Sequence, residues 1–210
     1  MKPILFKTEM VKAILDGRKT VTRRVIKGLP LSEPHAVVDE EGLWIADECG
    51  EFHRAEKYSK IQPGIVLYVQ ETFSTTTRKL LSVLDGGARH WSAEGEGPLR
   101  YIYKADCTLK DYPLPPPKWR PSIHMPKEAA RIFLRVTDVR ATVLQNIQPE
   151  DIWKEGIPYN GQSTIRELYD EFALLWDSTI KPLDLERYGW DANPWLWVIT
   201  FERINKKVKA

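Results

Sequence analysis

Charged and hydroxyl side chains are most concentrated in residues 17–24, GRKTVTRR, which hold four cations and two hydroxyls. A basic run is more often a solvated face than a site. Lys19 stands out because its cationic neighbours disfavour its ammonium form, so a partly buried Lys19 would have a lowered pKa and act as a base or a polarising donor. Thr22 is a nucleophile if a base takes its proton. In a regular strand these two side chains would point to opposite faces, so their convergence requires residues 18–22 to turn.

Two carboxylates are candidate partners for these groups. Glu155 ends a predicted short helix directly before Gly156, where a side chain often faces a cleft; the alternative is an exposed glutamate at a helix end. Glu71 follows a predicted buried strand and is the second candidate, because a carboxylate at the end of a buried strand usually has a function or an ion-pair partner.

The same basic run also suits nucleic-acid binding without catalysis. Its cations would neutralise phosphates, and aromatic side chains would stack on an unpaired base. The candidate binding residues are Arg18, Thr20, Arg23, Arg24, Tyr68, Glu71 and Trp190, with Lys27, Trp119 and Trp195 as further phosphate or stacking contacts. The residue types alone do not distinguish a groove that only binds nucleic acid from one that also catalyses its hydrolysis.

Composition places the chain among ordinary globular proteins, with 42% hydrophobic and 29% charged residues over 210 positions. The formal charge is only +2, so any nucleic-acid affinity must come from local patches. The N-terminus has no apolar stretch followed by a cleavage site, and no run of 18 apolar residues occurs, so we expect a cytoplasmic protein without membrane contact.

Metal and cofactor motifs are missing from the sequence. The four histidines lack ligand spacing, and there is no GxGxxG, P-loop or HExxH motif, so we expect no metal and no cofactor. Cys49 and Cys107 are too isolated for a metal site, and we expect two free thiols. The sequence does not indicate an oligomeric state.

The basic run follows a predicted short helix, with Thr8 as its N-cap and Gly17 where it stops. Two or three short antiparallel strands are predicted within residues 28–60, and a buried strand at 65–69. Residues of about 74–120 are rich in Gly and Pro and indicate a partly irregular insertion with one strand, at 101–104.

The second half alternates long strands with amphipathic helices. A short helix at 127–131 precedes a long, bent strand at 132–143, and another short helix covers 150–155. The clearest helix is 164–177, which begins with a capping box. A closing strand at 195–202 precedes a frayed lysine-rich tail.

Several strands with few helices between them predict an α+β fold, a small mixed β-barrel with short helices packed around it. We expect one domain over residues 1–210 that carries the insertion. There is no internal repeat and no βαβ alternation, which argues against a doubly wound fold.

At these residues the chain resembles the ASCH family of PUA-like β-barrel proteins, and most closely the long ASCH proteins of phages and prophages. The resemblance covers about two thirds of the chain and rests on residues 17–24, 67–73, 121–126, 136–140, 147–156 and 190–195. It implies a barrel with a cleft beside residues 17–20, and RNA or a nucleoside as ligand.

The resemblance also implies specific roles. In the small bacterial ASCH proteins that hydrolyse N4-acetylcytidine, a Lys and a Thr of this motif act with a Glu from the later helix. These positions fall on Lys19 as activator, Thr22 as nucleophile and Glu155 as an aid to proton transfer. This chain departs from them in its greater length and inserted region, and it has Gln70 where many phage relatives have Arg.

We therefore expect a metal-independent amidohydrolase acting on N4-acylated cytidine or a similar modified nucleoside. The alternative is an RNA-binding or single-stranded nucleic-acid-binding module without catalysis. A structural phage protein, whose barrel serves protein contacts, is the third interpretation.

Overall fold

The computed structural model of the chain divides into two compact units, each assembled from segments that are distant in the sequence. Unit 1 comprises Met1–Asp16, Leu67–Leu134 and Ile204–Ala210, and unit 2 comprises Gly17–Val66 and Arg135–Arg203. The structure describes residues 1–28, 36–40, 42–77, 80–83, 89–91, 100–107, 118–158 and 163–205. All three residues assigned a catalytic role by the resemblance, Lys19, Thr22 and Glu155, belong to unit 2.

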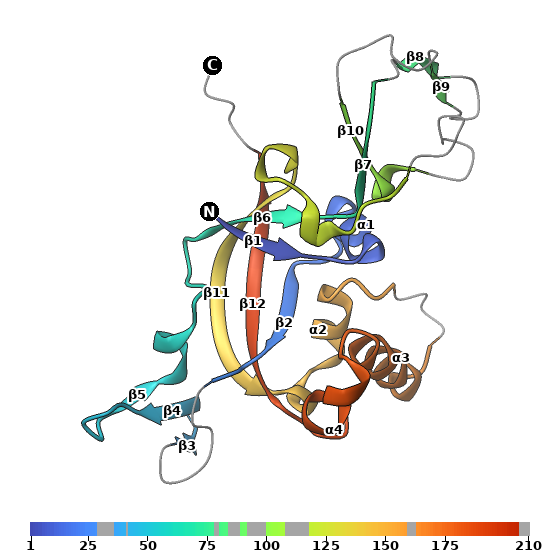
Figure 1. Ribbon diagram of the computed structural model, residues 1–210. Helices are drawn as coiled ribbons and strands as arrows, with labels where there is room; N and C mark the ends of the chain where they lie inside the picture. The colour runs from blue at the N-terminus through green and yellow to red at the C-terminus, as the bar shows by residue number, and fades with distance from the viewer. Residues whose placement is uncertain are drawn as a thin grey trace. The chain divides into compact units, whose positions relative to one another are not determined.

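Three strands that run side by side form the main sheet of unit 2 (Figure 1), in the order β11 (Phe133–Val143), β12 (Trp195–Ile204) and β2 (Val21–Val25). Strand β2 pairs antiparallel with β12, and Thr22 lies opposite Ile199. The pairing is regular, so alternate side chains of β2 lie on opposite faces of the sheet.

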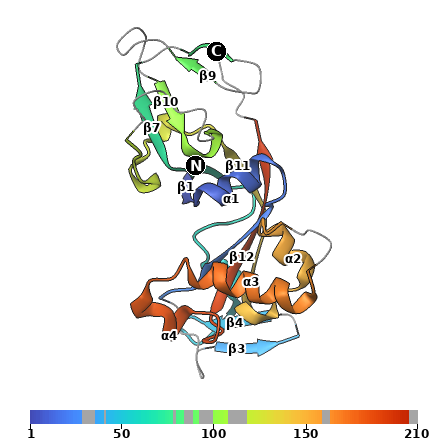
Figure 2. The same ribbon diagram turned by 90° about the vertical axis from the view of Figure 1, so that its right-hand side faces the viewer.

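Two helices pack beside each other against this sheet (Figure 2), α2 (Pro149–Lys154) and α3 (Ile165–Asp177). They share a buried apolar cluster with β12, made of Leu144, Ile147, Ile152, Ile157, Leu168, Phe172, Trp176 and Leu196. The capping box at the start of α3 is formed as predicted: the Thr164 hydroxyl accepts the Glu167 N–H, and the Glu167 carboxylate accepts the Thr164 N–H. This cluster holds α2 in place beside β2.

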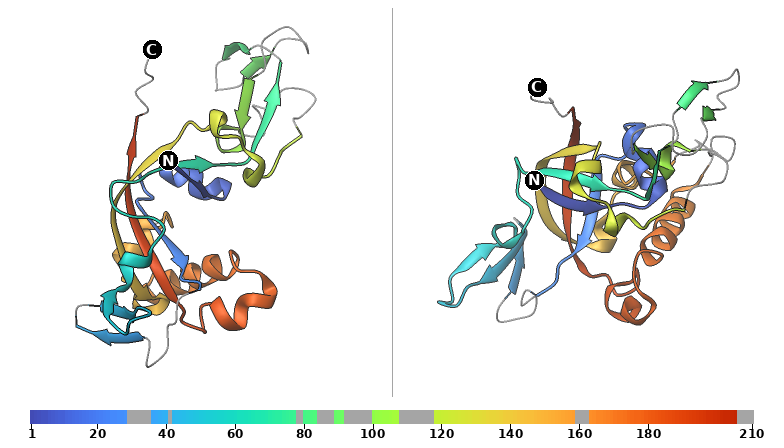
Figure 3. Two further views of the ribbon diagram at one scale, coloured as in Figure 1. Left: turned by 60° about the vertical axis from the view of Figure 1, so that its left-hand side comes forward. Right: turned by 45° about the horizontal axis from the view of Figure 1, so that its top comes forward.

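A small antiparallel sheet in unit 2 (Figure 3) is formed by β3 (Ala36–Asp39), β4 (Gly42–Ala46) and β5 (Phe52–Arg54). Its buried side chains Ala36, Leu43 and Ile45 form a second apolar cluster together with Ile26 and Ala55. Short 3-10 turns at Ala55–Tyr58, Leu144–Asn146 and Pro182–Asp184 and the one-turn helix α4 (Leu185–Tyr188) complete the described elements of unit 2.

Unit 1 is built around a parallel strand pair and a hairpin-like pair. Its elements are β1 (Lys2–Leu5), α1 (Thr8–Leu15), β6 (Val66–Gln70), β7 (Phe73–Thr76), β8 (Leu80–Val83), β9 (Arg89–Trp91), β10 (Arg100–Tyr103) and 3-10 turns at Lys104–Asp106, Ser122–His124 and Lys127–Ala129. Strand β1 pairs parallel with β6, and β10 pairs antiparallel with β7.

The α+β class predicted from the sequence is confirmed, and so are the strands near 65–69, 101–104, 132–143 and 195–202. The described strands do not close into a barrel, so the PUA-like barrel is not confirmed. Both cysteines are free thiols, as expected.

Several local predictions need correction. The residue preceding α1 is Lys7 in extended conformation, and Thr8 is the first helical residue without a side-chain cap. The helix expected at 127–131 is only a 3-10 turn, Lys127–Ala129, because Pro126 is followed by too few helix-compatible residues before the buried strand. The region 74–120 holds more strand than expected, since β7, β8 and β9 accompany β10; residues 78–79, 84–88, 92–99 and 108–117 of this region, like the tail 206–209, lie outside the described residues.

Candidate active site

The basic run caps the C-terminal end of helix α2 through three successive contacts. The Thr20 N–H donates to the Lys154 carbonyl at 2.9 Å, Lys19 Nζ to the Glu155 carbonyl at 2.8 Å, and Arg18 Nη1 to the Gly156 carbonyl at 2.7 Å. The last carbonyls of a helix have no partner within the helix and carry its negative end, so cations are stabilising there. The run therefore has a structural task in addition to any chemistry.

Lys19 forms a buried ion pair with Glu155. Its Nζ lies 2.6 Å from Glu155 Oε2, and the two side chains are 2% and 8% exposed. The same Nζ donates to the Glu155 carbonyl and, at 2.9 Å, to the Val21 carbonyl. An ammonium has three donors. All three donors of Lys19 Nζ are therefore engaged, and one of them binds the Glu155 carboxylate.

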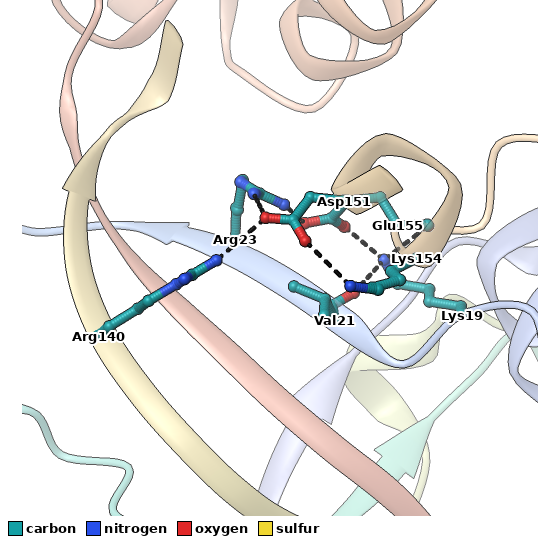
Figure 4. A network of polar contacts seen from close by, with 7 residues as sticks. All are labelled: Lys19, Val21, Arg23, Arg140, Asp151, Lys154 and Glu155. Atoms are coloured by element: carbon teal, nitrogen blue, oxygen red, sulfur yellow. Dashed lines mark hydrogen bonds and ion pairs between the residues drawn. The ribbon is translucent and has the colours of Figure 1, made fainter. Parts of the chain in front are cut away.

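Arg23 extends this pair into a network (Figure 4). Its Nη1 donates to Glu155 Oε1 at 3.0 Å, its Nη2 to Asp151 Oδ2 at 3.1 Å, and its side chain is 2% exposed. Asp151 Oδ2 also accepts from Arg140 Nη2 at 3.0 Å, and Asp151 Oδ1 from Lys154 Nζ at 3.4 Å. Every carboxylate oxygen of Asp151 and Glu155 therefore faces a cation.

Burial lowers the pKa of Lys19 more than any other influence. Glu155 acts in the opposite direction, and the charges of Arg24 and Arg23 lower this pKa further. Burial lowers the pKa of Arg24 as well. The sequence predicted the direction of the Lys19 shift from its cationic neighbours, and the structure adds desolvation as the larger cause.

Thr22 is buried, but its strand points it away from the network. Arg23, the next residue of β2, reaches Glu155, so the Thr22 side chain lies on the opposite face of the strand. Residues 18–20 lie outside any helix or strand, with Gly17 at φ +76°, so the chain turns before β2 begins at Val21. This turn brings Lys19, and not Thr22, to Glu155.

A pocket of ≈ 570 Å³ borders this network within unit 2. Charged and polar side chains dominate its wall. Its lining residues are Arg23, Val38, Asp39, Glu40, Gly42, Arg54, Glu56, Arg140, Ala141, Thr142, Val143, Asn146, Gln148, Asp151 and Trp195. Lys19, Thr22 and Glu155 do not line it, whereas Arg23, Arg140 and Asp151 belong to both the network and the pocket wall.

The other predicted binding residues have separate places. Arg18 is exposed, Thr20 and Arg24 are half-buried. Trp190 packs edge-to-face on Phe172, with 5.9 Å between ring centroids, against the apolar cluster of α2 and α3.

Two predicted residues, Tyr68 and Glu71, belong to unit 1. Tyr68 is half-buried in β6. Glu71 is buried and receives two hydrogen bonds from Arg131, Nε to Oε1 and Nη2 to Oε2, both at 2.9 Å. Glu71 is ion-paired in its own unit and is not a partner of Lys19.

Asp151 and Arg140 were not predicted as site residues. The sequence contains an indication that Asp151 lies beside Glu155, because it precedes Glu155 by four positions and residues so spaced share one face of a helix. It contains none for Arg140, since nothing in a strand sequence tells which helix its side chain will meet.

One group of potential metal ligands lies elsewhere in unit 2, at the turn between β4 and β5. Ligand atoms of Asp47, Glu51 and His53 all lie within 4.8 Å of one another. The Asp47 carboxylate already accepts the backbone N–H of Cys49 and Glu51 through Oδ1 and contacts His53 Nε2 at 2.9 Å through Oδ2. These contacts stabilise the turn, and they explain why the three side chains lie close together.

Comparisons with known proteins add little to this picture. No family model matches the chain, and no curated protein is similar to it. Among solved structures, the chain is similar to protein EF3133 from Enterococcus faecalis V583, a DUF984 protein, with a TM-score of 0.42 and 12% identity over 98% of this chain and 82% of that one. None of the described helices is long and apolar enough to cross a membrane.

Proposed function

We propose that this protein is a metal-independent amidohydrolase of the PUA-like ASCH type, which removes the acyl group from N4-acylated cytidine or a similar modified nucleoside. The observation that carries the proposal is the buried pair of Lys19 and Glu155, whose Nζ and Oε2 atoms lie 2.6 Å apart. The pair joins the two segments that the family resemblance assigned to catalysis, 136 positions apart in the sequence.

Amide hydrolysis needs a group that takes a proton from the nucleophile and returns it to the leaving amine. A lysine with a lowered pKa, hydrogen-bonded to a carboxylate, suits both tasks. In the proposed reaction the Thr22 hydroxyl attacks the acyl carbonyl and its proton passes to Lys19, after Lys19 has given its own proton to Glu155. The C–N bond then breaks and the N4 amine takes a proton from Lys19. Water hydrolyses the acyl-Thr22 ester to the free acid and the Thr22 hydroxyl, and Glu155 returns its proton to Lys19.

The assignment of Thr22 rests on the family resemblance, because its side chain lies on the opposite face of β2 from Arg23. Mass spectrometry of the protein during turnover tests it directly. We expect an acyl adduct on wild-type protein, located at Thr22, and none on Thr22→Val. An acyl group on another residue, or full activity of Thr22→Val, would remove Thr22 from the mechanism.

Chromatographic detection of cytidine released from N4-acetylcytidine tests the function as a whole. We expect turnover by wild-type protein and a loss of about 100-fold or more in Lys19→Ala, the usual scale of a general acid–base contribution. Lys12→Ala is the matched control, because Lys12 also pairs with a glutamate, Glu9 at 3.3 Å, but on the exposed surface of unit 1. Absence of turnover by the wild type, or undiminished turnover by Lys19→Ala, sinks the proposal.

The alternative, a nucleic-acid-binding module without catalysis, relied on Arg23 and Arg24 as phosphate contacts. Arg23 is 2% exposed and its two terminal nitrogens are bound to carboxylates, which favours hydrolysis over this alternative. Arg18 is the exposed cation of residues 17–24, and its Nη1 donates to the Gly156 carbonyl. Salt-sensitive binding of a short RNA that weakens equally in Arg18→Ala and Arg23→Ala would favour the alternative.

A further inference from the structure

We propose that the pocket beside Arg23 and Asp151 binds a mononucleotide, that is, a planar heterocycle carrying a phosphate. Its volume of ≈ 570 Å³ lies within the range of small-molecule sites. Neither Lys19 nor Glu155 lines this pocket, so the inference does not depend on the proposed hydrolysis. All its lining residues belong to unit 2.

Arg140 supplies the phosphate contact. Its side chain is 56% exposed, and within the part of the chain that the structure describes it makes one hydrogen bond, from Nη2 to Asp151. A guanidinium has five N–H donors in a planar fork that matches phosphate oxygens. Most of the donors of Arg140 therefore remain for a ligand, and Arg54 adds a second cation to the same wall.

Three of the four acidic residues of the wall, Asp39, Glu56 and Asp151, are engaged with the protein itself, and the fourth, Glu40, is exposed to solvent. Asp151 is compensated by Arg23, Arg140 and Lys154. Glu56 accepts the Ala141 N–H through Oε1 and lies 3.6 Å from Arg54 Nε, and Asp39 accepts the Gly42 N–H. These pairings reduce the repulsion that carboxylates would otherwise exert on a phosphate.

Trp195 and Gln148 supply contacts for a heterocycle. Trp195 is a half-buried member of the wall, and an indole face stacks on any nucleobase. Gln148 is exposed, and its carboxamide forms no hydrogen bond to other described residues, so its donor and acceptor are available to the edge of a base. An aromatic face, a free carboxamide and a partly free guanidinium in one pocket are the groups that a nucleotide requires.

Isothermal titration with cytidine 5′-monophosphate, cytidine and inorganic phosphate tests the proposal without any turnover, so failure of the hydrolase proposal leaves it intact. We expect the monophosphate to bind at least about tenfold more tightly than cytidine or phosphate alone, because charge-assisted hydrogen bonds add to stacking. Arg140→Gln should remove this difference. Trp195→Leu should weaken cytidine as well.

Lys154→Gln is the matched control, since Lys154 and Arg140 are both paired with Asp151 and are 53% and 56% exposed, but only Arg140 lines the pocket. We expect its affinity for the monophosphate to stay within about twofold of the wild-type value, and thermal unfolding of both variants shows that they are folded. If a 5′-phosphorylated trinucleotide binds more tightly than the monophosphate, the pocket binds the 5′ end of an RNA. This outcome supports the proposal, because the terminal nucleotide then occupies the pocket. No binding by wild-type protein, equal affinity for monophosphate and phosphate, or equal losses in Arg140→Gln and Lys154→Gln would overturn the proposal.

Discussion

Each unit of this protein contains a cluster of ion pairs around a buried glutamate, and the two clusters differ in the cation at their centre. In unit 1, Arg131 donates to both carboxylate oxygens of Glu71, donates to Asp106 through Nη1 and lies over the ring of Tyr103, 4.0 Å from its centroid. In unit 2, Lys19 and Arg23 share the two oxygens of Glu155.

The difference determines what each cluster can do. The carboxylates around Arg131 raise its pKa above an already high value, so this guanidinium never gives up a proton. Burial lowers the pKa of Lys19, which makes its proton easier to transfer. Burial raises the pKa of Glu71 and brings that of Tyr103 to about 12. We therefore assign structure to the cluster of unit 1 and chemistry to that of unit 2.

The largest expected effect comes from removing the central carboxylate of unit 2. Glu155→Gln leaves Lys19 and Arg23, both 2% exposed, without this negative charge, and removing one partner of a buried ion pair costs about 3–5 kcal/mol of unfolding free energy. Asp106→Asn should cost less, because Arg131 keeps both hydrogen bonds to Glu71. Urea denaturation measures both, and a larger loss in Asp106→Asn would reverse the comparison.

A smaller effect is expected in the pH dependence of stability, with opposite signs in the two units. The folded state holds the Glu71 proton to a higher pH than the unfolded state, so stability should fall as pH rises above 4.5. The folded state releases the Lys19 proton at a lower pH than the unfolded state, so stability should rise as pH approaches 10.5. Urea denaturation at several pH values measures both effects. The decrease in the free energy of unfolding above pH 4.5 should vanish in Glu71→Gln, and the increase toward pH 10.5 should vanish in Lys19→Met. If neither substitution changes the pH dependence of stability, the assignment is wrong.

The smallest effect is expected at the edge of the unit 2 network. Lys154 lies 3.4 Å from Asp151 and is 53% exposed, so Lys154→Gln should change the free energy of unfolding by less than about 1 kcal/mol. Arg23 and Arg140 continue to compensate Asp151 in this variant. A loss comparable to that of Glu155→Gln would mean that the network acts as one unit and that Lys19 has no special place in it.

The elements predicted best from the sequence are those with a local signal. Helix 164–177 carries a capping box and an apolar period of 3.6, and the strands at 132–143 and 195–202 are long and apolar. Strand β1 was missed, because four residues that include a proline carry too little alternation and its partner β6 lies more than sixty positions away.

The candidate site was predictable only in part. Glu155 was a candidate partner of Lys19 because it ends a short helix before Gly156, and the family resemblance indicated the same residue, although no local pattern connects residues 136 positions apart. The burial of Arg23 against carboxylates could not be foreseen, because a basic run at a helix end is ordinarily solvated. Asp151 could have been found from its spacing to Glu155.

The central claim is that proton transfer by Lys19 drives hydrolysis, and the rate of cytidine release from N4-acetylcytidine by Lys19→Arg tests it most directly. This variant keeps the positive charge beside Glu155 but cannot give up its proton. We predict that it loses about 100-fold or more of the wild-type rate, whereas Arg131→Lys in unit 1 retains it. A folded Lys19→Arg variant that releases cytidine as fast as the wild type would contradict the claim.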